Sequence, residues 1–147
     1  MNSALYNRDI LRLAASIPHQ RRLPGAQASV EKRSPTCGSR VAVDLVLGPD
    51  GRVAALGQEI KACALGQAAA ALMGEHALGR TGEELDTARA LLADFLAGRR
   101  DDPGSWPGLD LLAPARPFPA RHPSILLAFE AAAEAARVAA AIAPAER

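Results

Sequence analysis

The fold is decided by residues 40–61, which read RVAVDLVLGPDGRVAALGQEIK. The segment 40–47 alternates between apolar and other side chains, which is the pattern of a β-strand with one buried face. The apolar members of that face are Val41, Val43, Leu45 and Leu47. Residues 48–51, Gly-Pro-Asp-Gly, are strong turn formers. Residues 52–61 then supply the partner strand, so this stretch predicts an antiparallel pair with one face buried.

Two further elements precede this pair of strands. Residues 25–31 alternate in the same way and predict a first strand, which completes a three-stranded antiparallel sheet. Residues 3–17 carry apolar side chains at roughly helical spacing, and Pro18 closes that segment. The chain is therefore expected to begin with a helix and continue into the sheet.

After the sheet, the apolar spacing changes to that of helices. Residues 63–73 predict a helix that ends at Gly74. Thr81 and Glu84 have the spacing of a capping box, which predicts the start of a second helix. Gly98 supplies the stop signal of that helix.

The last part of the chain combines a loop and a long helix. Residues 99–121 are rich in proline and glycine and predict a long loop, which in a compact domain is often functional or mobile. A final helix is expected over 125–142, opened by His122-Pro123-Ser124. The order of elements predicts an α+β fold in which three helices pack on one face of the sheet. The length suits a single domain spanning residues 1–147.

The composition excludes several classes of function. Apolar residues make up 49% of the chain and aromatic residues 3%, so Ala, Leu, Val and Ile must build the core. The net charge of +1 gives no electrostatic case for nucleic acid or for an anionic membrane surface. No apolar run reaches the ~20 residues that a membrane span needs, and residues 1–12 lack the apolar core of a secretory signal. We expect a cytosolic protein.

Both cysteines are expected at junctions between elements. Cys37 lies between the first two strands beside Gly38, and Cys63 lies where the third strand gives way to a helix. A helix N-terminus and nearby basic residues such as Lys61 favour the thiolate form of a cysteine. These settings favour a role as metal ligands for both cysteines. The alternative for two cysteines in a reducing cytosol is a pair of buried structural thiols.

His122 is the third candidate ligand. It begins the last helix, so it meets Cys63 if the two helix N-termini point the same way. Thiolate and imidazole together suit iron, zinc or an iron–sulfur cluster. From the residues alone, a surface histidine at a helix end is equally consistent with this position. His19 and His76 lie in loop-like settings and are much weaker candidates.

Several short segments carry a resemblance to a known family. They are Leu5-Tyr6, Thr36-Cys37-Gly38 before a strand, Gly48-Pro49-Asp50-Gly51, Lys61-Ala62-Cys63-Ala64-Leu65-Gly66-Gln67-Ala68, and His122-Pro123-Ser124-Ile125-Leu126. In this order they resemble the U-type iron–sulfur cluster assembly scaffolds, which include the NifU N-terminal domain, IscU and SufU. The resemblance covers nearly the whole chain and implies an IscU-like fold.

The resemblance implies a scaffold or carrier that accepts sulfur from a cysteine desulfurase, binds iron or a [2Fe–2S] cluster, and passes it to recipient apoproteins. The family's ligands carry over to Cys37, Cys63 and His122. Two positions depart from the family pattern, because Ser39 replaces an aspartate and Pro123 replaces the third cysteine. A fourth ligand could come from Ser39, an exogenous thiol, a partner protein or a second chain.

Two alternative functions stay open. One is a metal-free protein that binds the desulfurase as a regulator or sulfur acceptor, and the other is a zinc-bound sulfur-transfer protein. The sequence offers no set of nucleophile, base and orienting residue, so we expect a carrier and not an enzyme.

Overall fold

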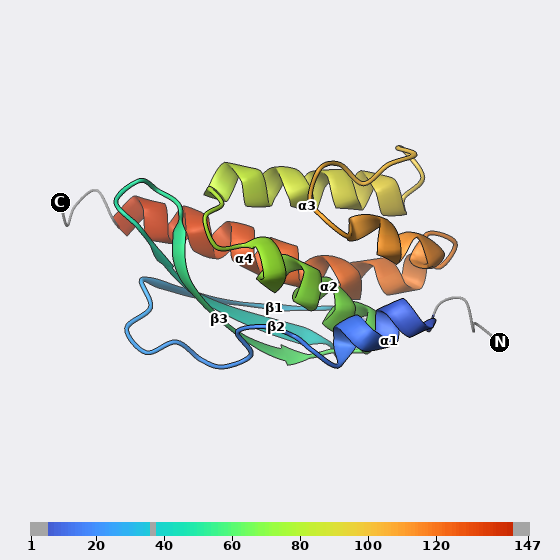
Figure 1. The fold of residues 1–147 in the computed structure, drawn as a ribbon, viewed down its shortest axis with the longest axis horizontal. Coiled ribbons are helices and arrows are strands. Elements are labelled where there is room, and N and C mark those ends of the chain that lie inside the picture. The colour runs from blue at the N-terminus through green and yellow to red at the C-terminus, as the bar shows by residue number, and fades with distance from the viewer. Residues whose placement is uncertain (1–5, 36–37, 143–147) are drawn as a thin grey trace.

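The sheet and its register follow the predicted strands closely. A computed structural model describes residues 6–35 and 38–142, and Figure 1 shows the sheet beneath a group of helices. The elements, in chain order, are α1 (Arg8–Ala14), β1 (Ala28–Arg33), β2 (Arg40–Leu47), β3 (Val53–Lys61), α2 (Ala64–His76), α3 (Gly82–Leu96), the 3-10 helices η1 (Leu109–Ala115) and η2 (Pro119–Arg121), and α4 (His122–Ile142). The predicted α+β fold is confirmed.

The three strands are antiparallel, in the order β1-β2-β3. β2 has the predicted bounds, and β3 begins one residue later than predicted. β1 is shifted to Ala28–Arg33, later than the predicted 25–31. The reason is local: Gly25 has a left-handed φ of 74°, and the side chain of Gln27 accepts a hydrogen bond from Leu47 N. Regular pairing therefore starts only at Ala28, opposite Leu45.

The alternating pattern predicted one buried face of the sheet. The structure also covers part of the opposite, outer face. Asp44 lies on this face, is buried, and accepts hydrogen bonds from Arg22, Ser29 Oγ and Leu23 N. A Cβ at Gly57 would lie 2.4 Å from Arg21 O, so only glycine allows the segment before β1 to cross here. The Arg22 guanidinium, with smaller contributions from Ser29 and Leu23 N, lowers the pKa of Asp44 to about 2.

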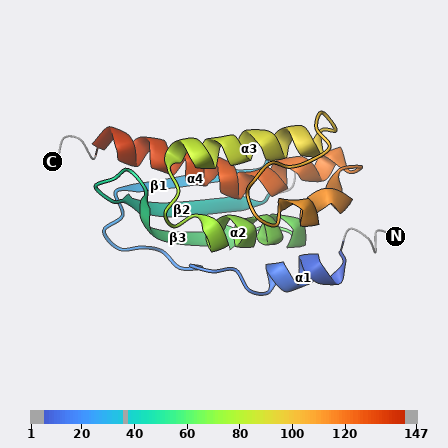
Figure 2. The same ribbon diagram turned by 45° about the horizontal axis from the view of Figure 1, so that its top comes forward.

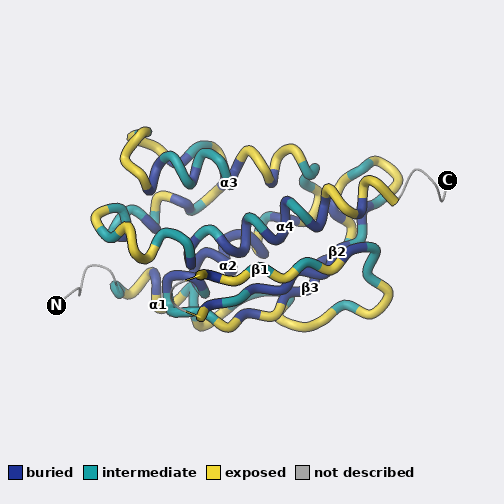
Figure 3. The backbone as a smooth tube through the Cα atoms, turned by 180° about the vertical axis from the view of Figure 1, so that it is seen from behind, coloured by how far each residue is buried: buried dark blue, intermediate teal, exposed yellow. Residues whose placement is uncertain are grey.

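The helices form layers on the other face. α2 and α4 contact each other, α4 packs on β1 and β2, α3 packs on α4, and α1 packs on α2. Figure 2 shows α3 above α4 and α1 beside α2, at the edge of the assembly. Figure 3 shows buried residues concentrated where α4 faces the sheet, whereas α3 alternates between buried and exposed residues. No helix within residues 6–35 and 38–142 is long and apolar enough to cross a membrane.

The bounds of α1 and α2 differ from the prediction, and α4 begins at His122, earlier than the predicted residue 125. α1 starts only after Asn7, whose side chain accepts a hydrogen bond from Ile10 N, and it ends at Ala14. α2 continues through Gly74 to His76. A Cβ at Gly74 would lie 2.6 Å from Gln58 Nε2 and 3.0 Å from Pro18 Cγ, so this glycine permits close packing and does not end the helix.

The segment 99–121 contains ordered structure that the prediction of a loop missed. Two 3-10 helices lie within it, and its side chains are anchored to the helices. Trp106 Nε1 donates to Leu72 O at 2.9 Å, and Arg116 donates to Phe95 O and Arg100 O, both at 2.8 Å. Proline and glycine interrupted the apolar spacing, so the sequence pattern did not reveal these short turns.

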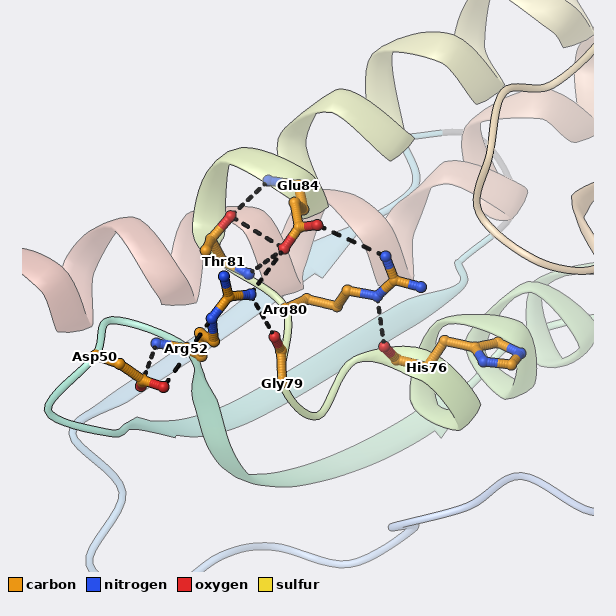
Figure 4. A network of polar contacts seen from close by, with 7 residues as sticks. All are labelled: Asp50, Arg52, His76, Gly79, Arg80, Thr81 and Glu84. Atoms are coloured by element: carbon orange, nitrogen blue, oxygen red, sulfur yellow. Dashed lines mark hydrogen bonds and ion pairs between the residues drawn. The ribbon is translucent and has the colours of Figure 1, made fainter.

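The predicted capping box at the start of α3 is confirmed. Thr81 Oγ1 accepts from Glu84 N, and the Glu84 carboxylate accepts from Thr81 N. The same carboxylate is paired with Arg52 and Arg80, as Figure 4 shows. Because Arg52 follows the β2–β3 turn, this network joins that turn to the α2–α3 connection. This network lies at the start of β3, whereas Cys63 lies beyond the other end of that strand.

Candidate functional site

Cys63 occupies the junction between β3 and α2, as predicted. It is the N-cap residue of α2 with an extended backbone, yet its side chain makes no capping hydrogen bond. Its Sγ lies instead 3.5 Å from Ser124 Oγ, near the start of α4. Cys63 is half-buried and forms no disulfide with any residue that the structure describes. The sulfur therefore contacts a hydroxyl of α4 and does not cap its own helix.

Ser124 links Cys63 to the connection between β1 and β2. Its hydroxyl donates to Ser39 Oγ at 3.1 Å, and both serines are buried, with exposed fractions of 3% and 5%. By the resemblance, Ser39 takes the position of an aspartate ligand. Two hydrogen bonds, both through Ser124, link Ser39 to the Cys63 sulfur. The chain Ser39–Ser124–Cys63 joins three elements that are far apart in sequence.

A glycine in α2 makes this approach of α4 possible. A Cβ at Gly66 would lie 2.8 Å from Ser124 Oγ and 2.7 Å from Ala62 Cβ. Real Cβ atoms do not tolerate contacts this short, so any larger residue would push the first turns of α2 and α4 apart. Gly66 thus sets the distance between Cys63 and Ser124.

An open pocket of about 770 Å³ contains these residues. Its lining residues are Gly38, Ser39, Lys61, Ala62, Cys63, Gln67, Ala120, Arg121 and Ser124. Lys61 and Arg121 are exposed, and no carboxylate is among the described lining residues. Neither cation forms an ion pair with a residue in the described parts of the chain. The pocket therefore presents a sulfur, two hydroxyls and positive charge.

His122 begins α4, two residues before Ser124, and its Nε2 lies 2.9 Å from Ala115 O. A carbonyl oxygen can only accept, so Nε2 carries the hydrogen of this bond. In the neutral ring Nδ1 then has its lone pair available, and a backbone carbonyl on the opposite nitrogen is a common arrangement for histidine ligands. With Nε2 bound to this carbonyl, Nδ1 is the ring nitrogen left for a metal, although His122 is not among the residues lining the pocket.

The other predicted residues are placed as follows. Cys37 lies outside the described residues, but its neighbour Gly38 lines the pocket. His76 ends α2, at the opposite end from Cys63, and its ring contacts the edge of Trp106. The carbonyl of His19 accepts from Gln58 N in β3. No group of three His, Cys, Asp or Glu residues that could hold a metal forms among the described residues.

Ser124 and Gly66 are the site residues that the sequence did not single out. Both lie inside segments already quoted for their cysteine or histidine, so their position beside a candidate ligand was the available signal. What the sequence could not give is the contact between them, because it depends on how α2 and α4 cross.

Two solved structures give the fold independently of the sequence pattern. A SUF-system protein from the thermophile Fervidobacterium islandicum AW-1, described as an iron–sulfur cluster assembly scaffold, has a TM-score of 0.83 at 18% identity, covering 91% of this chain and 98% of that one. A hypothetical protein solved at 2.3 Å has a TM-score of 0.80 at 21% identity, covering 92% and 98% of the two chains. At these identities the likeness concerns the fold alone.

A third structure is closer in sequence. The N-terminal part of a nitrogen-fixing NifU-like protein from Brucella abortus has a TM-score of 0.89 at 34% identity, covering 95% of this chain and 96% of that one. No protein-family model matches the sequence, and a search of curated proteins finds no match. The fold and this likeness in sequence define a protein of the iron–sulfur scaffold class. The chain belongs to the NifU/IscU/SufU-type family of iron–sulfur cluster assembly scaffolds.

Proposed function

We propose that this protein is a cytoplasmic carrier, built as one domain, that accepts sulfur from a cysteine desulfurase at Cys63. It then holds iron or a [2Fe–2S] cluster with Cys63, Cys37 and His122 and delivers this cargo to recipient apoproteins. It works as a scaffold and carries out no catalytic turnover of its own.

The observation that carries this proposal is the setting of Cys63. Its sulfur borders an open pocket that also contains Lys61 and Arg121, with no carboxylate among the described lining residues. A persulfide is an anionic donor, and local positive charge attracts it and its anionic leaving group. In the transfer step the Cys63 thiolate attacks the outer sulfur of the desulfurase persulfide. The S–S bond of the desulfurase breaks, and its cysteine leaves as a thiolate.

Iron binding would rest on three donors, two of which the structure describes. Cys63 offers one thiolate, and His122 offers Nδ1 because Nε2 is bound to Ala115 O. Cys37 follows from the family resemblance. Ser39 is a weak ligand beside the carboxylate that the family has there, because its hydroxyl must first lose a proton. A cluster usually takes four protein ligands, so the cargo would be bound weakly or with a ligand from a partner.

A second function is favoured by the charge of the pocket. Lys61 and Arg121 repel a divalent cation, and the departures at Ser39 and Pro123 each remove a ligand that is anionic when bound. A metal-free sulfur acceptor or regulator of the desulfurase fits this balance of charge, whereas the zinc-bound alternative meets the same repulsion as iron.

One anaerobic experiment separates these functions. The protein is incubated with a cysteine desulfurase and cysteine, first without iron and then with iron, followed by mass spectrometry, metal analysis and absorption spectroscopy. A scaffold gains sulfane sulfur on Cys63 and, with iron, visible absorbance. A metal-free acceptor gains only the sulfur, and a zinc protein retains stoichiometric zinc without colour. Absence of both sulfur and metal would refute the proposal.

A further inference from the structure

We infer that Ser124 is a positioning residue for the Cys63 sulfur. Its hydroxyl, itself held by Ser39, selects the side-chain rotamer in which Sγ faces the pocket between α2 and α4. This inference rests on the proposed function of Cys63 as the sulfur-accepting residue, and it names the residue that aims that sulfur.

The first argument is where the sulfur points. A residue at an N-cap position normally turns its side chain back to the free amide groups of its own helix. Cys63 makes no such bond, and its Sγ lies 3.5 Å from Ser124 Oγ instead. Among the residues that the structure describes, Ser124 is the hydrogen-bond partner of this sulfur. Cys63 also packs against the hydrophobic core, and the Ser124 hydroxyl adds the polar contact that favours this rotamer.

The second argument is that Ser124 is itself fixed. It is 3% exposed, in the first turn of a 21-residue helix, and its hydroxyl bonds to a second buried hydroxyl, that of Ser39. A buried side chain with a satisfied hydrogen bond loses little further entropy when it holds a neighbour. Ser124 is therefore preorganised to orient Cys63, in the way that outer partners orient the ligands of metal sites.

The third argument is the chemistry of a hydroxyl. It can accept a hydrogen bond from a protonated thiol, and it can donate one to a sulfur that carries a metal ion or a second sulfur atom. Ser39 can reverse its role in the same way, because it is also a hydroxyl. Rotation of the hydroxyl hydrogens lets the sulfur keep its direction while its chemical state changes. A carboxylate at position 39 would only accept.

Gly66 offers a way to move Ser124 without removing its hydroxyl. A Cβ at this position would lie 2.8 Å from Ser124 Oγ and 3.2 Å from Ser124 O. Gly66→Ala therefore displaces the hydroxyl from the sulfur while the chemistry of all three residues stays the same. Loss of orientation in both Gly66→Ala and Ser124→Ala would identify the contact, and not the serine alone, as the cause.

The test is solution NMR of the apo protein, which needs no cargo. The three-bond Hα–Hβ couplings of Cys63 report its rotamer: we expect one rotamer in the natural protein and averaged couplings in Ser124→Ala, Ser39→Ala and Gly66→Ala. Ser29→Ala is the matched control, because it removes a hydroxyl bound to Asp44 on the outer face of the sheet. It should destabilise the fold and leave the Cys63 couplings unchanged.

Sulfur transfer from the desulfurase is measured in parallel, and we expect it to slow about tenfold or more in Ser124→Ala, as for loss of an outer partner of a ligand. Trypsin cleavage after Arg33, Arg40, Lys61 and Arg80 places the two cysteines on different peptides, so the sulfur on Cys63 is read separately. If Ser124→Ala does not fold, Ser39→Ala carries the test.

The outcomes distinguish this inference from the function on which it rests. A single unchanged rotamer in Ser124→Ala and Ser39→Ala overturns the positioning role, even if the natural protein accepts sulfur. If the variants show averaged couplings but the natural protein accepts no sulfur, the positioning role is supported and the proposed function is refuted.

Discussion

Arg22 and Asp44 meet on the outer face of the sheet through two parallel hydrogen bonds, from Nε to Oδ2 at 2.8 Å and from Nη2 to Oδ1 at 2.9 Å. The side chain of Asp44 is 3% exposed and that of Arg22 is 53% exposed, so the carboxylate loses more of its hydration. The pair ties the segment before β1 to the middle of β2. Removing the guanidinium would leave a buried charge without its strongest partner.

This pair predicts acid sensitivity. Because the folded-state pKa of Asp44 is lowered from 3.8 to about 2, its contribution is complete above about pH 4 and is lost as the pH falls toward 2. Its size is on the order of 2 kcal/mol. We expect the difference in free energy of unfolding between the natural protein and Asp44→Asn to shrink across this window, measured by denaturant titration. A difference that is constant with pH would contradict the assignment.

Gly74→Ala should destabilise the protein, although alanine favours a helix over glycine by about 1 kcal/mol. Gly74 is buried inside α2, and the added Cβ would lie 2.6 Å from Gln58 Nε2 and 3.0 Å from Pro18 Cγ. We expect a net loss of about 1–3 kcal/mol, as for other overpacked sites. Thermal and denaturant unfolding measure it.

The neighbouring exposed Glu75 provides the control for Gly74→Ala. Glu75→Ala tests helix propensity without new contacts and should change stability by less than about 0.5 kcal/mol. A Gly74→Ala protein more stable than the natural one would mean that α2 does not pack this closely on β3.

Arg116→Ala should loosen the segment 99–121. Arg116 donates to Phe95 O and Arg100 O and lies over the Phe95 ring, with 4.5 Å from Cζ to the ring centroid. Loss of these bonds should cost about 1–3 kcal/mol. Trp106 is the single tryptophan and is buried, so its fluorescence reports release of the segment. Arg99→Ala, whose partner Asp94 is exposed to solvent, should leave the emission unchanged.

Restoring the family ligands should strengthen metal binding. We predict that Ser39→Asp with Pro123→Cys raises the affinity for iron or zinc substantially, because it supplies a carboxylate and a thiolate. Cys37→Ser and Cys63→Ser should each abolish whatever metal the natural protein binds. Metal content after reconstitution and gel filtration is compared between the natural protein and these three variants. If the natural protein and both serine variants hold equal metal, the ligands lie elsewhere.

A folded double variant that gains no metal would show that this geometry is not that of a scaffold site. The sulfur-acceptor function would then be favoured. The expected convergence of Cys37, Cys63 and His122 on one site is a prediction.

The elements that the sequence predicted well depend on local signals. The alternation in 40–47 and the Thr81–Glu84 capping box each specify structure within a few residues, and both are confirmed. The contact of Ser124 with Cys63 spans 61 residues and depends on the crossing of two helices, so no local pattern could predict it. Gly74 was misread because glycine has two uses in a helix, as a stop and as a site of close approach, and only the packing distinguishes them.

The anchors of the segment 99–121 have a consequence for how this protein can change over evolution. Trp106 and Arg116 each donate to main-chain carbonyls, at Leu72, Phe95 and Arg100. Every amino acid has a main-chain carbonyl, so a substitution at an acceptor position keeps the acceptor of the hydrogen bond. A substitution at Trp106 or Arg116 removes the donor. The hydrogen bonds of Trp106 and Arg116 can therefore be gained or lost by single substitutions at the donor, without a matching change at the acceptor residue. Because Ala120 and Arg121 of this segment line the pocket of Cys63, the gain or loss of such anchors is a route by which the surroundings of the cysteine can diverge.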